Sequence, residues 1–561
     1  MKIQTRSKLL AEQSRAEQSR AEQSRAEQSR AEQSRAEQSR AEHLFDVISW
    51  VALAAAFLML VFFLNARIDT LLDSDMSSEL VLSRLLAQQG KIITPDWYYS
   101  TEIRFLNTQL FYTLFFKLMS DWHRVRILSY ICMYIVLIAS YWLLCRSLKC
   151  EKYFAITAAL LLTPFSEPYF FIILKGAYYI PHITITLLTL AMQELFLQAD
   201  RKRKKWFALL AALLAMAAGM GGPRQVFVLY LPLFLAGAWN WYSQKGKKET
   251  EWQLLFTVIA AGSGTAGYVV NRKILAPRYH FASWESMSFT GLDSGRVAQI
   301  FNGFLNSYGY QTGGLFSKKA LLANSMCLCL ILITIYAVGY ALKHQDRVSN
   351  EYYRLAGFAA ALFGIFTLLY LCTNMSYARW YNIPVIVITI PLIAEMLQNL
   401  PQEKIKRYLG TLAFTGFVML NGLIFYRDTW RQDDTLELRQ IQRQMVEQEY
   451  TSGYATFWRA NILTELSNGE IEMWDWCDGG LENIQDVDQT YHWLQLVEHD
   501  DTHPEGKVFL FFSKDEFEKC TWYAQLKREH VVYHSDNYVV LGYENYDVMR
   551  AEVMPQSTKG K

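Results

Sequence analysis

The sequence predicts a polytopic α-helical membrane protein with about eleven transmembrane helices and a small extracytoplasmic α/β domain at its C-terminus. Hydrophobic residues make up 52% and aromatic residues 15% of the 561-residue chain. Long apolar runs alternate with short polar connections, and about 20 apolar helical residues are enough to cross a bilayer. The mean hydropathy of only +0.04 averages these runs with a polar N-terminal segment and a polar tail.

The N-terminal segment, residues 1–44, is of low complexity. The unit AEQSR is repeated six times from Ala11 to Arg40. Each unit places Glu three residues before Arg, which supports a solvated helix. A five-residue period turns the helical face by about 140° per repeat, so no continuous coiled-coil seam forms. The repeat is either a helical spacer or a tolerated tandem expansion, and the second interpretation is favoured.

Residues 45–426 carry the predicted transmembrane domain. The first apolar run extends from Phe45 to Leu64. The ten further candidate spans are residues 127–145, 153–165, 179–198, 207–220, 225–240, 253–270, 320–342, 355–372, 382–397 and 408–425. Lys and Arg cluster in every second connection, which by the positive-inside rule places those connections and the N-terminus in the cytoplasm. The loop 66–125 and the tail 427–561 are then extracytoplasmic.

The pattern of the tail predicts a small α/β domain. KVFLFF at 507–512 has the pattern of a buried strand, and HVVYHSDNYVVLGY at 530–543 reads as two strands joined by a Ser-Asp-Asn turn. The tail is also rich in Trp and Tyr, which either form its core or stack on sugar rings.

The outer loop 66–125 is the first candidate for chemistry, because connections in compact proteins are usually short. Its stretch DSDMSSELVLSRLLAQQG predicts a helix that begins at Asp73 or Asp75 and ends at Gly90. Asp75, Asp73 and Glu79 are the candidate catalytic carboxylates. They either cap the helix and favour its positive end, or act as general base or, at Asp75, as a ligand for Mg or Mn.

Other residues on the predicted outer side complete the candidate site. Glu102 and Glu167 form a candidate second carboxylate site, with interfacial turn residues as the alternative. The candidate ligands of a donor phosphate are Arg379, Arg224 and Lys175; arginines at span ends also snorkel to lipid headgroups. The candidate acceptor or sugar contacts are Trp97, Tyr98 and His182.

The order of features over residues 45–200 resembles that of a known family. An apolar span, an acidic loop with a helix ending in Gly, LFYTLFFKLMSDWHRVRILSY, a span ending LLCRSLKC and a run ending LLTPFSEP follow one another. This order is similar to GT-C glycosyltransferases of the polyprenyl-phosphate-mannose, protein O-mannosyltransferase-like type. The resemblance implies a GT-C-like fold, an inverting transfer from a polyprenyl-phosphate sugar on the outer face, and a catalytic acid at Asp75 or its neighbour Asp73. Where that family often has His-Pro-Pro, this chain has Asn107-Thr108-Gln109.

The expected function is therefore a membrane glycosyltransferase of the cell envelope, with an extracytoplasmic glycan, lipid or protein as acceptor. A scaffold with a glycan-binding tail and a lipid-linked sugar transporter or flippase are the alternatives; spans nearly free of interior charge disfavour a transporter. A net charge of +2 gives no basic excess for nucleic acid. The cysteines show neither metal-site spacing nor a disulfide framework, which together with the lipid carrier favours a bacterial plasma membrane.

Overall fold

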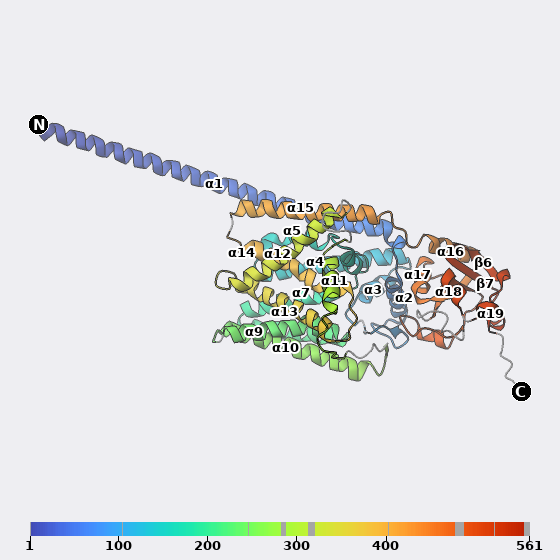
Figure 1. The fold of residues 1–561 in the computed structure, drawn as a ribbon. Helices are drawn as coiled ribbons and strands as arrows, with labels where there is room; N and C mark the ends of the chain where they lie inside the picture. The colour runs from blue at the N-terminus through green and yellow to red at the C-terminus, as the bar shows by residue number, and fades with distance from the viewer. Residues whose placement is uncertain are drawn as a thin grey trace.

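The computed structural model describes residues 2–101, 103, 105–244, 246–281, 288–311, 320–401, 403–476, 487–520 and 522–554. It is a helical bundle with a small mixed sheet at one end and a long N-terminal helix that projects from the opposite end (Figure 1). This arrangement confirms the predicted fold class, a polytopic helical membrane protein with a small C-terminal α/β region.

Helix α1, Lys2–Arg67, joins the AEQSR repeats and the first span into one 66-residue helix. Its length is about 100 Å at 1.5 Å per residue. The apolar half packs against α5 and α15, and the repeat half extends away from the bundle (Figure 1). The repeats therefore continue a transmembrane helix.

Nine helices in the described part of the chain are long and apolar enough to cross a membrane. They are Ala36–Thr70, Trp122–Ser147 (α4), Ile180–Gln198 (α7), Val226–Ser243, which contains α9 (Leu231–Ser243), Lys248–Leu275, which contains α10 (Lys248–Val270), Leu321–Lys343 (α12), Asn350–Cys372 (α13), Arg379–Asn399, which contains α14 (Ile383–Asn399), and Lys404–Thr429 (α15).

Two of the eleven expected spans are not among these nine. The stretch 153–165 forms the eight-residue helix α5, Phe154–Leu161, which is too short to cross and ends just before Pro164. The stretch 207–220 lies in α8, Arg201–Met220, which is long enough but begins with the basic run RKRKK. By length and composition the expected number is thus corrected from eleven to nine for the described residues.

The tail contains a five-stranded sheet of order β4-β3-β5-β7-β6. The strands β3, β4 and β5 are parallel, and β7 runs antiparallel to β5 and β6. The predicted strands are found as β5, β6 and β7. The elements are α16 Leu436–Glu447, β3 Tyr450–Thr456, α17 Phe457–Leu466, β4 Glu472–Trp476, β5 Lys507–Ser513, α18 Lys514–Lys519, β6 Val531–His534, β7 Tyr538–Tyr543 and α19 Tyr546–Val553.

The loop between the first two spans connects the bundle to the tail. It contains α2 Ser74–Gln89, β1 Tyr98–Tyr99 and α3 Gln109–Phe116. Strand β1 pairs in parallel with β2, His280–Phe281, and α17 of the tail packs along α2. At this junction the Arg126 guanidinium of α4 holds the Glu465 carboxylate of α17 through two hydrogen bonds of 2.8 and 2.6 Å. The loop, the bundle and the tail therefore meet around α2.

Candidate functional site

The predicted loop helix is present as α2, and Asp73 is its N-cap. Asp73 has an extended backbone, with φ −133° and ψ 164°, and its Oδ1 accepts a 3.0 Å hydrogen bond from the Met76 N–H. Gly90, at φ 66°, ends the helix in the left-handed conformation that glycine tolerates best. Of the two caps that the sequence left open, the structure selects Asp73 and places Asp75 in the first turn, half-buried.

Lys175 comes to Asp73 from a distant segment. It ends a π-helical turn, Phe170–Lys175, and its Nζ lies 3.0 Å from Asp73 Oδ2. The same ammonium donates to the Leu71 carbonyl at 2.8 Å and lies 4.5 Å from the Phe171 ring. Because the side chain is only about 10% exposed, its charge is held in one position beside α2.

Tyr178 completes this group. Its hydroxyl donates a 2.6 Å hydrogen bond to Asp73 Oδ1. Burial and the nearby negative charges of Asp73 and Asp75 raise the pKa of Tyr178 well above its usual value, so the phenol stays protonated. Sequence reasoning missed Tyr178, and its place three residues after Lys175 in KGAYY was the signal. We call Asp73, Asp75, Lys175 and Tyr178 the acid–lysine cluster.

Arg224 and His182 line one small cavity, and Arg224 contacts Tyr179, the residue that follows Tyr178 of the acid–lysine cluster. The Arg224 guanidinium lies 4.8 Å from the ring of Tyr179, and His182 Nδ1 lies 3.0 Å from the Gln225 amide nitrogen. Arg224, His182 and Gln225 line a small cavity of about 20 Å³, enough for one water molecule. Asn107, from the stretch where the resembling family has His-Pro-Pro, lines the same cavity.

Arg379 and Glu167 form an ion pair of 2.7 Å, and each side chain is about half exposed. Glu167 begins the short helix α6, Glu167–Tyr169, and Arg379 begins the turn before α14. Ser307, in α11 (Arg296–Ser307), connects the two segments, since its carbonyl accepts from Ser166 and its hydroxyl donates to the Arg379 carbonyl, both at 2.7 Å. The structure thus brings a predicted acid and a predicted phosphate ligand together.

Glu79 of α2 is buried and is not part of the acid–lysine cluster. It is 3% exposed, and its Oε2 accepts a 2.9 Å hydrogen bond from the Thr108 hydroxyl. This geometry joins α2 to the segment before α3 and favours a structural role over a catalytic one, because a buried, hydrogen-bonded carboxylate cannot meet a substrate hydroxyl.

Trp97 and Tyr98 attach the loop to the tail. Trp97 is fully buried, and its backbone bridges Leu496. The Tyr98 hydroxyl donates to Asp500, and its ring stacks on His492 at 4.3 Å. A buried indole cannot contact a sugar, so the role expected for Trp97 is not supported; the aromatic faces are used within the protein. Glu102, the other expected member of the second carboxylate site, lies outside the described residues.

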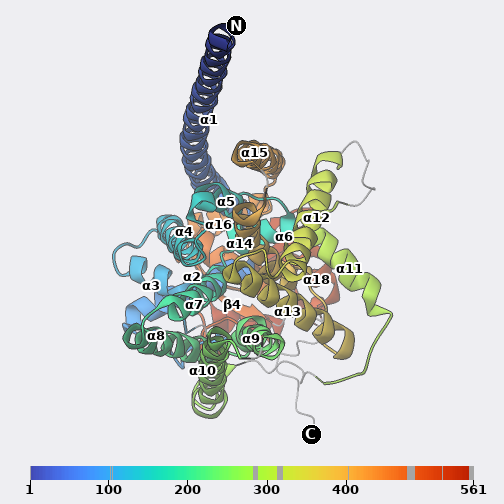
Figure 2. The ribbon, with the colours of Figure 1, turned by 90° about the vertical axis from the view of Figure 1, so that its left-hand side faces the viewer.

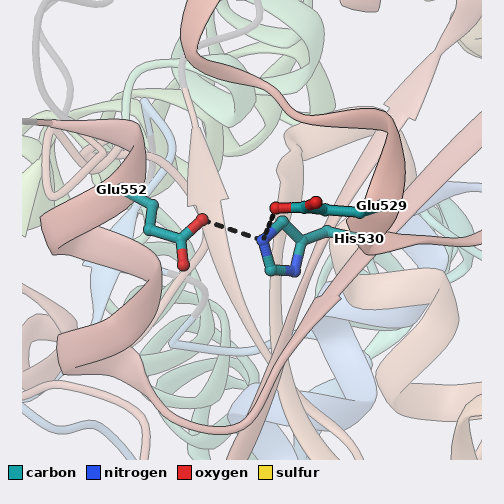
Figure 3. A group of neighbouring side chains, drawn as sticks. All are labelled: Glu529, His530 and Glu552. Carbon is teal, nitrogen blue, oxygen red and sulfur yellow. Dashed lines mark hydrogen bonds and ion pairs between the residues drawn. The ribbon is translucent and has the colours of Figure 1, made fainter.

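One group in the described part of the chain has the spacing of metal ligands, and it lies in the tail. Figure 3 shows Glu529, His530 and Glu552, with His530 Nε2 2.8 Å from Glu552 and 3.9 Å from Glu529. The Lys527 ammonium lies 2.9 Å from the same Glu552 carboxylate and holds the pKa of that carboxyl below its usual value. Since a lysine already compensates these acids, we interpret the group as an ion-pair network.

No protein-family model matches this chain, and no curated protein matches its sequence. Its structure is similar to the crystal structure of ArnT from Cupriavidus metallidurans in the apo state, with a TM-score of 0.54 and 12% identity over 89% of this chain and 98% of that one. A second structure of ArnT, bound to undecaprenyl phosphate, gives a TM-score of 0.53 and 12% identity, over 88% and 97% of the two chains. ArnT is a GT-C glycosyltransferase, and the likeness shows that this chain has the GT-C fold.

Proposed function

We propose that this chain is a membrane glycosyltransferase that transfers a sugar from a polyprenyl-phosphate donor to a hydroxyl acceptor, with inversion at the anomeric carbon. The GT-C fold supports the class, and ArnT with bound undecaprenyl phosphate supports the kind of donor. One observation carries the proposal. Asp73, which caps α2 two residues before Asp75, pairs with the buried Lys175 from a segment about a hundred residues away, at the tail-facing end of the bundle.

Asp75 acts as the general base in this proposal. Asp73 already accepts from the Met76 N–H and the Tyr178 hydroxyl and pairs with Lys175, so both of its oxygens are engaged within the protein. Asp73 therefore positions the cluster. The Asp75 carboxylate takes the proton of the acceptor hydroxyl while that oxygen bonds to the anomeric carbon. The bond between this carbon and the phosphate oxygen breaks, and polyprenyl phosphate leaves.

Three cations serve the departing phosphate. Lys175 supplies a fixed charge beside the acids, and Arg224 and Arg379 offer planar guanidinium groups that pair with phosphate at two points. Arg379 is half exposed and pairs with an equally exposed Glu167, so exchanging this partner for a phosphate costs little. In this proposal His182, which lines the same small cavity as Arg224, contacts the sugar.

Asp75 also presents the oxygen donors that Mg²⁺ and Mn²⁺ prefer, and such ions bind through one or two carboxylates together with substrate phosphates. A bound ion would neutralise the donor phosphate. Asp75 fits this role, whereas the Asp73 carboxylate is already paired with Lys175, and a chelator tests whether the reaction uses an ion.

We place the acid–lysine cluster on the extracytoplasmic side of a plasma membrane. Lys152 lies 2.8 Å from Asp46 and Lys404 lies 2.9 Å from Glu42, so two basic connections gather at the end from which the repeat helix projects. Basic connections mark the cytoplasmic side. The tail and α2 lie at the opposite end (Figure 1). The acceptor is then a glycan, lipid or protein of the cell envelope.

The first experiment is transfer of radiolabelled sugar from a pool of polyprenyl-phosphate sugars into membrane extract by the purified protein. Asp75→Asn should lower kcat by about 10²–10⁴-fold, the usual contribution of a general base. Asp73→Asn keeps the helix cap but weakens the Lys175 pair, so its loss should be smaller. Asp547→Asn removes an exposed first-turn acid of α19 and is the matched control.

The same assay with EDTA reports on a divalent ion. Equal kcat for wild type and Asp75→Asn, with Asp73→Asn inactive, would make Asp73 the base. Absence of transfer by the folded wild type with every donor would contradict the proposal and favour a glycan-binding scaffold or a transporter.

A further inference from the structure

An apolar slot lies between the first and last spans, where both reach the tail-facing end of the bundle. Its volume is about 260 Å³, and its lining is almost entirely apolar. Met59, Phe62 and Phe63 of α1 form one wall, and Tyr426 and Trp430 form the other. None of the residues in the acid–lysine cluster lines it, so the slot is separate from the site described above.

The slot opens toward lipid. Helices α1 and α15 lie next to each other at the edge of the bundle (Figure 2). The Phe62 and Trp430 rings stack at 5.9 Å with 15° between their planes, and the two side chains are 65% and 40% exposed. An exposed apolar surface on a membrane-spanning helix faces hydrocarbon, so the occupant of this slot is a lipid chain.

The charge at its mouth is positive. Arg427 and Arg431 are the charged residues that line the slot. Arg427 pairs with the exposed Asp428 at 2.7 Å, and the exposed Arg431 side chain makes no hydrogen bond or ion pair with any described residue. The Arg67 guanidinium, 5.6 Å from the Trp430 ring, adds a third positive charge. Guanidinium groups beside a tryptophan at a span end match the level of lipid phosphates.

We propose that this slot binds one hydrocarbon chain of an anionic glycerophospholipid of the outer leaflet, whose phosphate contacts Arg431 and Arg427. The apolar walls take the chain, and the arginines at the mouth select the anionic headgroup. The inference stands apart from the proposed transfer reaction, because it uses neither the acids of α2 nor Lys175.

Trp430 provides a probe inside the site. The full-length protein is placed in nanodiscs containing brominated-chain phosphatidylglycerol or brominated-chain phosphatidylcholine, and the quenching of tryptophan fluorescence is titrated. The contribution of Trp430 is the difference between wild type and Trp430→Phe, a change that keeps an aromatic ring on Phe62. We expect Trp430 to be quenched at about fivefold lower mole fraction of phosphatidylglycerol than of phosphatidylcholine.

Replacing both arginines that line the slot, Arg427→Gln and Arg431→Gln, should reduce this preference to the share that Arg67 supplies, while leaving the quenching itself. Trp239 of α9, which is 61% exposed, is the matched control and should respond equally to both lipids. Equal quenching of Trp430 by both lipids in the wild type would overturn the headgroup assignment. A Trp430 shielded from both lipids, as in a dimer formed through this face, would overturn the lipid site.

Discussion

At the scale of single residues, acids that are close in the sequence differ in their contacts and in their burial. Asp73 and Asp75 are two positions apart, yet Asp73 caps α2 and holds Lys175 and Tyr178, while Asp75 occupies the first turn. Glu79, one turn further on, is buried against Thr108. The residue type therefore indicates chemistry only together with its partners, and here the partners come from other segments.

Asp475 gives a prediction at this scale. It is fully buried in β4, with an Asn461 amide donating to it at 3.2 Å, and burial raises its pKa well above the usual value. A raised folded-state pKa contributes stability that is complete below the unfolded-state pKa, about 3.9, and is lost as the pH rises through the folded-state pKa. Asp475→Asn should therefore raise the Tm at pH 7 by about 2–4 °C, and the gain should shrink as the pH approaches 4.

Thermal unfolding between pH 4 and pH 8, with hydrogen exchange of β3, β4 and β5 to locate the transition in the tail, measures this effect. The exposed Asp547→Asn change is the control. A Tm that falls by the same amount at every pH would show that Asp475 serves as a hydrogen-bond acceptor that Asn cannot replace.

At the scale of elements, a buried ion pair connects the start of α2 to a span and to the tail. Arg126 of α4 pairs with Glu465 of α17 and donates to the Met76 carbonyl at 3.1 Å, in the first turn of α2. Both side chains are at most 4% exposed. The arginine thus connects a span, the tail and the turn that carries Asp75.

Removing one partner should cost more than removing both. Arg126→Met leaves a buried Glu465 without its cation and should lower stability by about 3–5 kcal/mol. Arg126→Met with Glu465→Met removes both charges and should recover most of this loss, while transfer activity stays low because the contact with Met76 is not restored. Thermal unfolding and the transfer assay separate the two effects. A double variant with full kcat would show that Arg126 does not position α2.

At the scale of the whole molecule, the repeat helix α1 and the sheet of the tail lie at opposite ends of the bundle (Figure 1). The repeat helix leaves at the end where Lys152 and Lys404 gather, and the tail lies beyond α2 at the other. We predict that in intact spheroplasts a protease removes an epitope tag from the C-terminus and spares one at the N-terminus. Permeabilised cells provide the control, in which both tags are lost. Digestion of the N-terminal tag alone in intact cells would invert the assigned orientation.

The sequence alone predicted much of the fold. Apolar runs of bilayer length have few alternatives to a membrane helix, because unpaired backbone groups are costly in lipid. Local signals were also sufficient for α2, which has an acidic cap and ends at Gly90, and for the strands β5, β6 and β7. The signals that predict these features lie in residues that are close in the chain, even where the strands themselves pair with distant segments. The segment 153–165 did not follow its prediction. Its apolar composition predicted a transmembrane span, but it folded as the short buried helix α5.

What only the tertiary structure decided is which side chains meet. Lys175 reaches Asp73, Arg379 pairs with Glu167, and Arg126 joins Glu465, across separations that no periodicity in the sequence encodes. The burial of single side chains could not be predicted from the sequence either. Trp97 and Tyr98 follow one another in the chain but differ in exposure once the tail packs on them. The sequence determined the elements through local propensity and hydropathy. The tertiary structure decided the candidate site, because ion pairing and burial depend on how distant segments pack.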